Sequence, residues 1–95
     1  MIDAVSAKQI TNNAIERRWD EIEQGNLTLF REIEEAIRTA ALRRVYTTSL
    51  TLVTNVENAE WIIEVLRYRY GYDADPDGQW KAGQVPRITI SWVKG

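Results

Sequence analysis

The spacing of apolar residues changes near residue 45 from a helical period to strict alternation. Upstream, segments of about 6–24 and 27–44 repeat apolar residues every three or four positions, as amphipathic helices do. Ser6 is the expected cap of the first helix, and Gly25-Asn26 is the expected break between the two. The first apolar line is thin, and the second is continuous. Their members are Ile10, Ala14 or Ile15, Trp19 and Ile22, and then Phe30, Ile33, Ile37, Ala40 and Ala41.

In residues 45–54 one face carries Tyr46, Leu50 and Leu52 with two threonines, and the other face is almost entirely hydroxyl-bearing. This pattern predicts a strand covered on one face only. A helix capped by Asn55 follows from Val56 and stops at Gly71. A second strand opens at Tyr72, and 87–93 forms the third. The helix is expected to bury one stripe of side chains: Ala59, Ile62, Ile63, Leu66 and Tyr70, broadened by Trp61, Val65 and Tyr68.

These elements predict a single α+β domain over residues 1–95, with a helical region at 1–44 and a β-α-β-β region at 45–95. We expect a small three-stranded mixed sheet with helices on one face. A crossover through the helix makes strands one and two parallel, either adjacent or with the third between them. The hydroxyl-rich face is either simply wetted by solvent or a polar site. Its residues are Thr47, Ser49, Thr51, Thr89 and Ser91.

The composition excludes several kinds of chemistry. The chain has no cysteine and no histidine, which removes disulfides, thiolate nucleophiles, Cys/His zinc sites and imidazole bases. Helical glutamates such as Glu23 and Glu64 are expected on solvated faces, so we expect no enzyme, cofactor or metal. The net charge of −2 gives no strong nucleic-acid signal. No apolar run is long enough for a membrane span and the start is not secretory, which favours the cytoplasm.

One short motif has the form of a calcium-binding loop. Asp73-Ala74-Asp75-Pro76-Asp77-Gly78 matches its opening D-x-D-x-D-G. The twelfth position, however, is Gln84 in place of the bidentate glutamate, and no helix follows. A Pro-Asp-Gly turn leaving the second strand is therefore the favoured interpretation.

The connection from Asp75 to Pro86 is long for so small a domain and is a candidate partner or ligand surface. It carries Trp80 and Lys81 between two glycines. Trp80 is either an anchor folded over the edge of the core or a contact residue for a partner.

The basic residues form a second candidate site, since nine of the twelve are arginines and several follow helix ends beside tyrosines. Arginines near aromatic rings can hold a small anionic ligand such as a nucleotide. Ordinary ion pairs and helix-end charges explain the same residues. The candidates are Arg43, Arg44, Arg69 and Arg87, and Arg67 lies on the same helix end as Arg69.

The order of elements resembles small uncharacterised α+β accessory proteins encoded by bacteriophages. The resemblance spans roughly 30–92 and is carried by Ile33-Glu34-Glu35-Ala36-Ile37 with Ala40-Ala41, by Leu66 through Gly71-Tyr72, and by the terminal Ile90-Ser91-Trp92. It implies a viral protein acting in the host cytoplasm, and it assigns no functional residue. The 75–86 loop is longer than in that pattern.

Together these features predict a non-enzymatic binding protein whose partner is a host protein. Self-association as a homodimer or larger oligomer is also expected, through the first helix. A nucleotide-sequestering module and a minor structural component of the virion stay open as alternatives.

Overall fold

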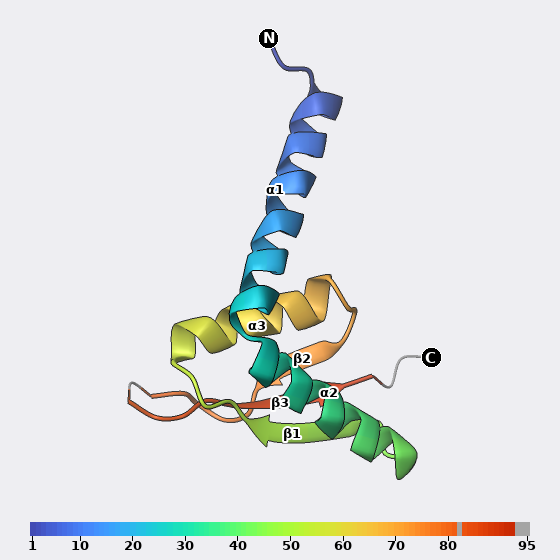
Figure 1. Cartoon of the computed structure of the whole chain (residues 1–95), viewed down its shortest axis with the longest axis vertical. Helices are drawn as coiled ribbons and strands as arrows, with labels where there is room; N and C mark the ends of the chain where they lie inside the picture. The colour runs from blue at the N-terminus through green and yellow to red at the C-terminus, as the bar shows by residue number, and fades with distance from the viewer. Residues whose placement is uncertain (82, 93–95) are drawn as a thin grey trace.

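The computed structural model describes residues 1–81 and 83–92 and confirms the α+β order of elements. Its helices are α1 (Ala4–Gly25), α2 (Leu27–Leu42) and α3 (Val56–Tyr68), and its strands are β1 (Thr47–Thr51), β2 (Asp73–Pro76) and β3 (Arg87–Ser91). Figure 1 shows α2 and α3 beside the sheet, and α1 with its lower end at α3 and its N-terminal part projecting away from the body. Val93, at the end of the expected third strand, lies outside the described residues.

The sheet has the order β1-β3-β2, so β1 and β2 run in the same direction with β3 between them. This is one of the two expected arrangements. Both ladders are antiparallel, however, and the prediction of a mixed sheet is wrong. A mixed sheet needs a parallel hydrogen-bonded pair, and β3 separates the only two strands that share a direction.

The core lies between the sheet and the two helices that cover it. Ile88 and Ile90 of β3 are fully buried, and α2 contacts β1 while α3 contacts β2. Leu50 and Thr48 of β1 are partly covered on the same face, whereas Thr47, Ser49 and Thr51 are exposed, as the alternation predicts. The other buried apolar residues are Ile22, Ile33, Leu52, Ala59, Ile62, Ile63, Val65, Leu66 and Ala74.

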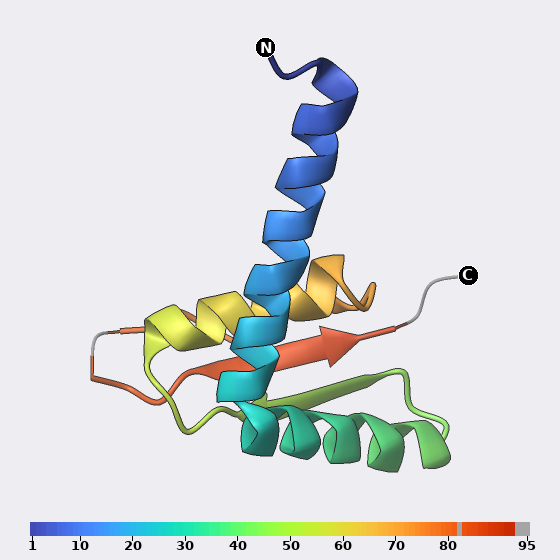
Figure 2. The same cartoon turned by 45° about the horizontal axis from the view of Figure 1, so that its top comes forward.

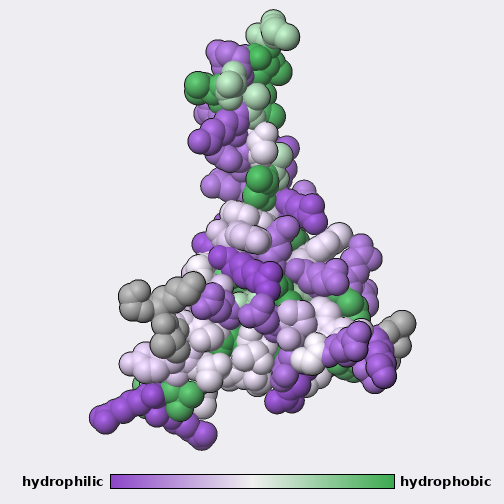
Figure 3. All heavy atoms as spheres, turned by 180° about the vertical axis from the view of Figure 1, so that it is seen from behind, coloured by the Kyte–Doolittle hydropathy of each residue, from purple (hydrophilic) through white to green (hydrophobic). Residues whose placement is uncertain are grey.

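The hydroxyl-bearing face of the sheet bonds largely to itself. Ser49 and Thr89 share a hydrogen bond between their hydroxyls (3.0 Å), and Thr47 Oγ1 donates to the Ile90 carbonyl (3.2 Å). Seen from behind, the molecule is mostly neutral to hydrophilic over its body (Figure 3). These contacts account for the hydroxyls of Thr47, Ser49 and Thr89 without a ligand.

Two helix starts show how the local sequence acts. Asn55 caps α3 as predicted, with its side chain accepting from Asn58 N–H (2.7 Å). The predicted cap of α1 is wrong. Asp3 caps the helix, and its carboxylate accepts a hydrogen bond from Ser6 N–H (2.8 Å). Both residue types cap well, and the helix begins one turn earlier because Asp3 comes first. The hydrogen bond from Ser6 holds the pKa of the Asp3 carboxyl below its usual value.

Candidate functional site

The base of α1 is fixed to the body by apolar contact. Ile22 is buried, and Trp19 is half-buried against the core. The indole N–H of Trp19 donates to Glu64 of α3 (3.3 Å), and the Arg18 guanidinium lies 5.2 Å from the ring centre of Trp61. The last two turns of α1 are therefore held along one side of α3.

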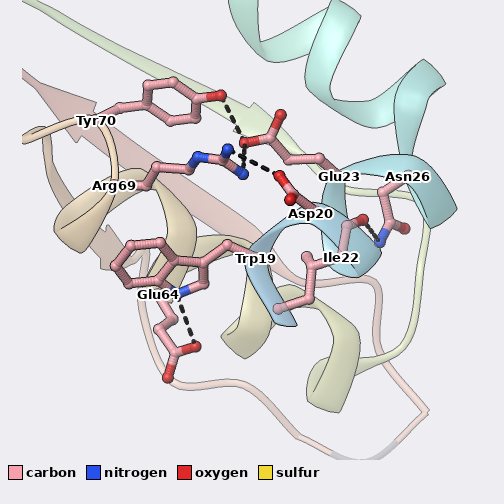
Figure 4. A network of polar contacts seen from close by, with 8 residues as sticks. All are labelled: Trp19, Asp20, Ile22, Glu23, Asn26, Glu64, Arg69 and Tyr70. Atoms are coloured by element: carbon pink, nitrogen blue, oxygen red, sulfur yellow. Dashed lines mark hydrogen bonds and ion pairs between the residues drawn. The ribbon is translucent and has the colours of Figure 1, made fainter. Parts of the chain in front are cut away.

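An ionic cluster holds the same junction (Figure 4). Arg69, just after α3, lies 2.8 Å from an Asp20 carboxylate oxygen and 3.3 Å from one of Glu23. The Tyr70 hydroxyl donates to Glu23 as well. The hydrogen bond to Asp20 raises the pKa of Arg69, and the bond to the Glu23 carboxylate, helped by burial, raises the pKa of Tyr70. One arginine thus ties two turns of α1 to the end of α3.

A pair of asparagines completes the junction at the turn between α1 and α2. Asn58 Nδ2 donates to Asn26 Oδ1 (2.7 Å) and to Thr54 Oγ1 (2.8 Å). Asn26 Nδ2 donates in return to Asn58 Oδ1 (3.2 Å) and to the Ile22 carbonyl (2.8 Å). Each of these two asparagines donates a hydrogen bond to the other and accepts one from it. This reciprocal pairing fixes how the α1–α2 turn sits on α3, because each donor finds an acceptor only in that arrangement.

Beyond this base, residues 1–17, which we name the arm, are exposed throughout. Val5 keeps 78% and Ile10 56% of its surface exposed, and Ile15 keeps 40%. Ile10 and Ile15 belong to the thin apolar line of the helix but stay outside the core, because the body ends near Trp19. Figures 1 and 2 both show the arm projecting alone, and Figure 3 shows hydrophobic side chains at its free end.

Open grooves lie at several places on the part of the surface that residues 1–81 and 83–92 form. One of about 430 Å³ lies between α2 and the end of α3 and is lined by Phe30, Ile37 and Tyr72. Another, of about 500 Å³, lies where α1 leaves α3, beside Ile15 and Tyr68. A further groove, of about 480 Å³, runs between α2 and β1. Within the described residues no three acidic side chains gather as a metal site.

The arginines predicted to form an anion site are not brought together. Arg69 pairs with α1 at the junction, and Arg87 pairs with Asp77 (2.9 Å). Arg43 borders the groove between α2 and β1 near Thr47, whereas Arg87 pairs with Thr51 at the opposite end of the β1–β3 ladder. Arg44 has a left-handed φ of 63° and takes the position that glycine often holds after a helix, with Val45 N–H bonding back to Ala40 O (3.0 Å).

The long loop is folded back on the sheet by its tryptophan. Trp80 is half-buried against the core, and its indole N–H donates to the Arg87 carbonyl (2.9 Å). Lys81 beside it is exposed. The contacts of Trp80 are those of the structural anchor.

The aspartates of the calcium-like motif lie in β2 or directly after it. Asp73 to Pro76 form β2, and Asp75 accepts from Arg67 (2.6 Å). Asp77 bonds to Arg87 through both its N–H and its carboxylate. An extended strand directs alternate side chains to the same face and does not wrap them around one ion.

Sequence reasoning missed the residues that build the junction. Glu23 and Glu64 were expected on solvated faces, and Tyr70 was expected in the buried stripe of α3. Instead α3 ends at Tyr68, so Tyr70 leaves the stripe, stays 51% exposed and reaches Glu23. The only local signal was the run Arg67-Tyr68-Arg69-Tyr70 at a helix end; no period shows which acidic partner it meets.

Comparison with known proteins adds no relative: no family model, curated protein or solved structure matches this chain. None of the helices in the described part of the chain is long and apolar enough to cross a membrane.

Proposed function

We propose that this chain is a non-enzymatic binding protein that presents the arm of α1 to another protein. The observation that carries the proposal is the contrast within one helix. Its last two turns are held by the cluster around Arg69, while its first turns expose Val5 and Ile10 and contact no other described element. A helix fixed at one end displays its free side chains in a constant direction.

The overall dimensions support this proposal. The accessible surface is 7000 Å², whereas a compact protein of 11.0 kDa exposes about 5600 Å². The radius of gyration is 15.4 Å, against about 12 Å for a compact chain of this length. The excess of about 1400 Å² is larger than the roughly 800 Å² that each partner contributes to a standard protein–protein interface.

The side chains of the arm indicate what its partner is like. Asp3 and Lys8 are the only charged side chains among residues 1–15, and they cancel. Val5 and Ile10 supply apolar surface on different sides of the helix. Such a helix suits a largely apolar, weakly charged groove that is deep enough to contact more than one side of the helix, a variant of the helix-in-groove mode of recognition. In keeping with the resemblance to phage accessory proteins, we propose a protein of the bacterial host as the owner of that groove.

The test is quantitative affinity capture from bacterial lysate, followed by binding measurements with the purified partner. We expect Val5→Asp and Ile10→Asp to weaken binding at least tenfold, because a carboxylate in an apolar groove is left without a partner. Val53→Asp is a matched control, since Val53 is also 78% exposed but lies on the body. Binding that survives both arm substitutions, or that Val53→Asp reduces equally, would contradict the proposal.

A further inference from the structure

The sheet has two edge strands, β1 and β2, and their hydrogen-bonding groups face in known directions. Trp92 N–H donates to Tyr46 O (3.0 Å), and Leu52 N–H donates to Pro86 O (2.8 Å). Bonded and non-bonded pairs alternate along an antiparallel ladder, so the even-numbered residues of β1 face β3. Thr47, Ser49 and Thr51 therefore direct their N–H and C=O groups away from the sheet.

The opposite edge is blocked. Asp77 N–H donates to Arg87 O (2.7 Å), so the odd-numbered residues of β2 face β3 and Ala74 and Pro76 face outward. The Ala74 carbonyl accepts from Arg67 Nε (2.6 Å), and Pro76 has no N–H to offer. Charge, proline and a covering side chain are the usual means by which proteins prevent strand addition.

No such protection is present on β1. Residues 45–56 contain no charged side chain and no proline. Three residues with the same outward orientation therefore offer an uninterrupted row of donors and acceptors along this edge. Because one edge of the same small sheet is closed and the other is open, we consider β1 a surface for pairing.

The groove of about 480 Å³ beside this edge is complementary to itself. Its α2 wall is a single helical stripe with acidic residues at the start, small residues in the middle and arginine at the end. The stripe consists of Glu32, Glu35, Ala36, Thr39, Ala40 and Arg43. When a second copy of this stripe lies antiparallel to the first, Glu32 faces Arg43 and Ala36 faces Thr39. A partner of a single charge sign would not match both ends.

We propose that β1 is the interface between two copies of this chain, pairing antiparallel with β1 of the second copy about a twofold axis at Ser49. Thr47 then lies opposite Thr51 of the second copy, and the two three-stranded sheets join into one of six strands. The α2 helices run antiparallel above the joint, with Glu32 facing Arg43 of the second copy at both ends.

The pairing of the β1 strands and the pairing of the α2 helices require the twofold axis at similar positions. From Arg43 to the middle of the α2 stripe is about 8 Å along a helix, and from Thr47 to Ser49 is about 7 Å along a strand. Both Arg43 and Thr47 line the same end of the groove, so the two centres lie at similar depths. One twofold axis can therefore serve the strand and the helix together, as an isologous contact requires.

The test is the mass of the intact chain in solution, by sedimentation equilibrium and native mass spectrometry. We expect a dimer of 22.0 kDa, twice 11.0 kDa. Ser49→Pro should raise the dimer dissociation constant at least tenfold, because it removes an outward N–H that β3 does not use, as Pro76 does on the closed edge. Ser49→Ala removes the hydroxyl, keeps the N–H and should leave the dimer unchanged.

A charge exchange gives a second readout that does not depend on Ser49→Pro folding well. Arg43→Glu should weaken the dimer, and adding Glu32→Arg in the same chain should restore it. A monomer at every concentration would overturn the inference, as would a dimer that neither Ser49→Pro nor Arg43→Glu weakens. Loss of the dimer on Val5→Asp in place of these changes would assign self-association to the arm instead.

Discussion

Individual side chains at the junction of α1 and α3 each form hydrogen bonds with two neighbours. Glu23 accepts from both Arg69 and Tyr70, and Asn58 donates to both Asn26 and Thr54. Exposed ion pairs contribute little by themselves, but a shared carboxylate links several of them into one network. The network contributes more to the direction of α1 than to the total stability.

The hydroxyl of Tyr70 gives the network a pH dependence. Its pKa lies above the ordinary value of 10.0 because the hydroxyl donates a hydrogen bond to the Glu23 carboxylate and is partly buried. A raised pKa means that this contribution to stability is fully present below pH 10 and is lost as the pH rises through the folded-state pKa. We expect the difference in unfolding free energy between the intact chain and Tyr70→Phe to shrink with pH above this value.

Urea unfolding at a series of alkaline pH values measures this difference, and a tyrosinate absorbance titration identifies the group. Tyr46→Phe is the control, because Tyr46 is similarly exposed at 59% and lies just before β1, outside the cluster formed by Glu23, Arg69 and Tyr70. A difference that stays constant across the alkaline range would show that the Tyr70 bond to Glu23 does not form in solution.

At the level of elements, Gly25 at the end of α1 and Gly71 shortly after α3 require different backbone conformations. Gly25 is the last residue of α1, and a methyl group there meets nothing within 4 Å. Gly71 has equally open space but a φ of 77°. We expect Gly25→Ala to raise the unfolding free energy by about 0.5–1 kcal/mol, and Gly71→Ala to lower it by about 1–2 kcal/mol.

Urea denaturation of both variants checks this pair, with unchanged m-values showing that the unfolded states are comparable. A loss of stability in Gly25→Ala would mean that the α1–α2 turn needs a flexible residue before Asn26. Equal effects at the two positions would mean that the left-handed backbone of Gly71 is not maintained in solution.

The sequence predicted best the features that depend on neighbours along the chain. Asn55 as a cap, the break at Gly25-Asn26 and the two faces of β1 follow from local spacing and are confirmed. A helical period shows which residues share a face but not whether another element covers it. For that reason the spacing did not show that Ile10 is exposed, and the role of Glu23 could not be seen.

The candidate sites were harder to predict because they depend on long-range contacts. Arg69 and Arg87 look alike in sequence, yet one meets α1 and the other meets Asp77. The open edge of β1 required the strand order, since any of the three strands could have lain in the centre. The sequence alone did show that β2 carries charge and proline and that β1 carries neither.

At the level of the whole molecule, the arm and the body should differ in local stability. Residues 4–14 are exposed, whereas residues 19–25 lie beside the junction with α3. Regions with few packed contacts open locally at low cost and exchange hydrogen quickly. We expect hydrogen exchange of the isolated chain to be clearly faster over 4–14, and to slow there when the arm is bound.

Exchange measured by mass spectrometry on peptides from both segments tests this expectation. Residues of α2 serve as an internal reference, because that helix packs on β1 along its length. Equal protection along all of α1 would show that the arm is already covered in solution, either by another copy or within the chain.

The turn at Asn26 makes α1 a lever. Its 22 residues span about 33 Å at 1.5 Å per residue, and a single residue separates them from α2. A rotation of about 10° at that residue, with the contacts of the junction shifting to allow it, would move the free end by about 6 Å, as far as one helical turn. Substitutions at Asn26 or Asn58 can thus redirect the tip of the arm without altering any residue that touches a partner.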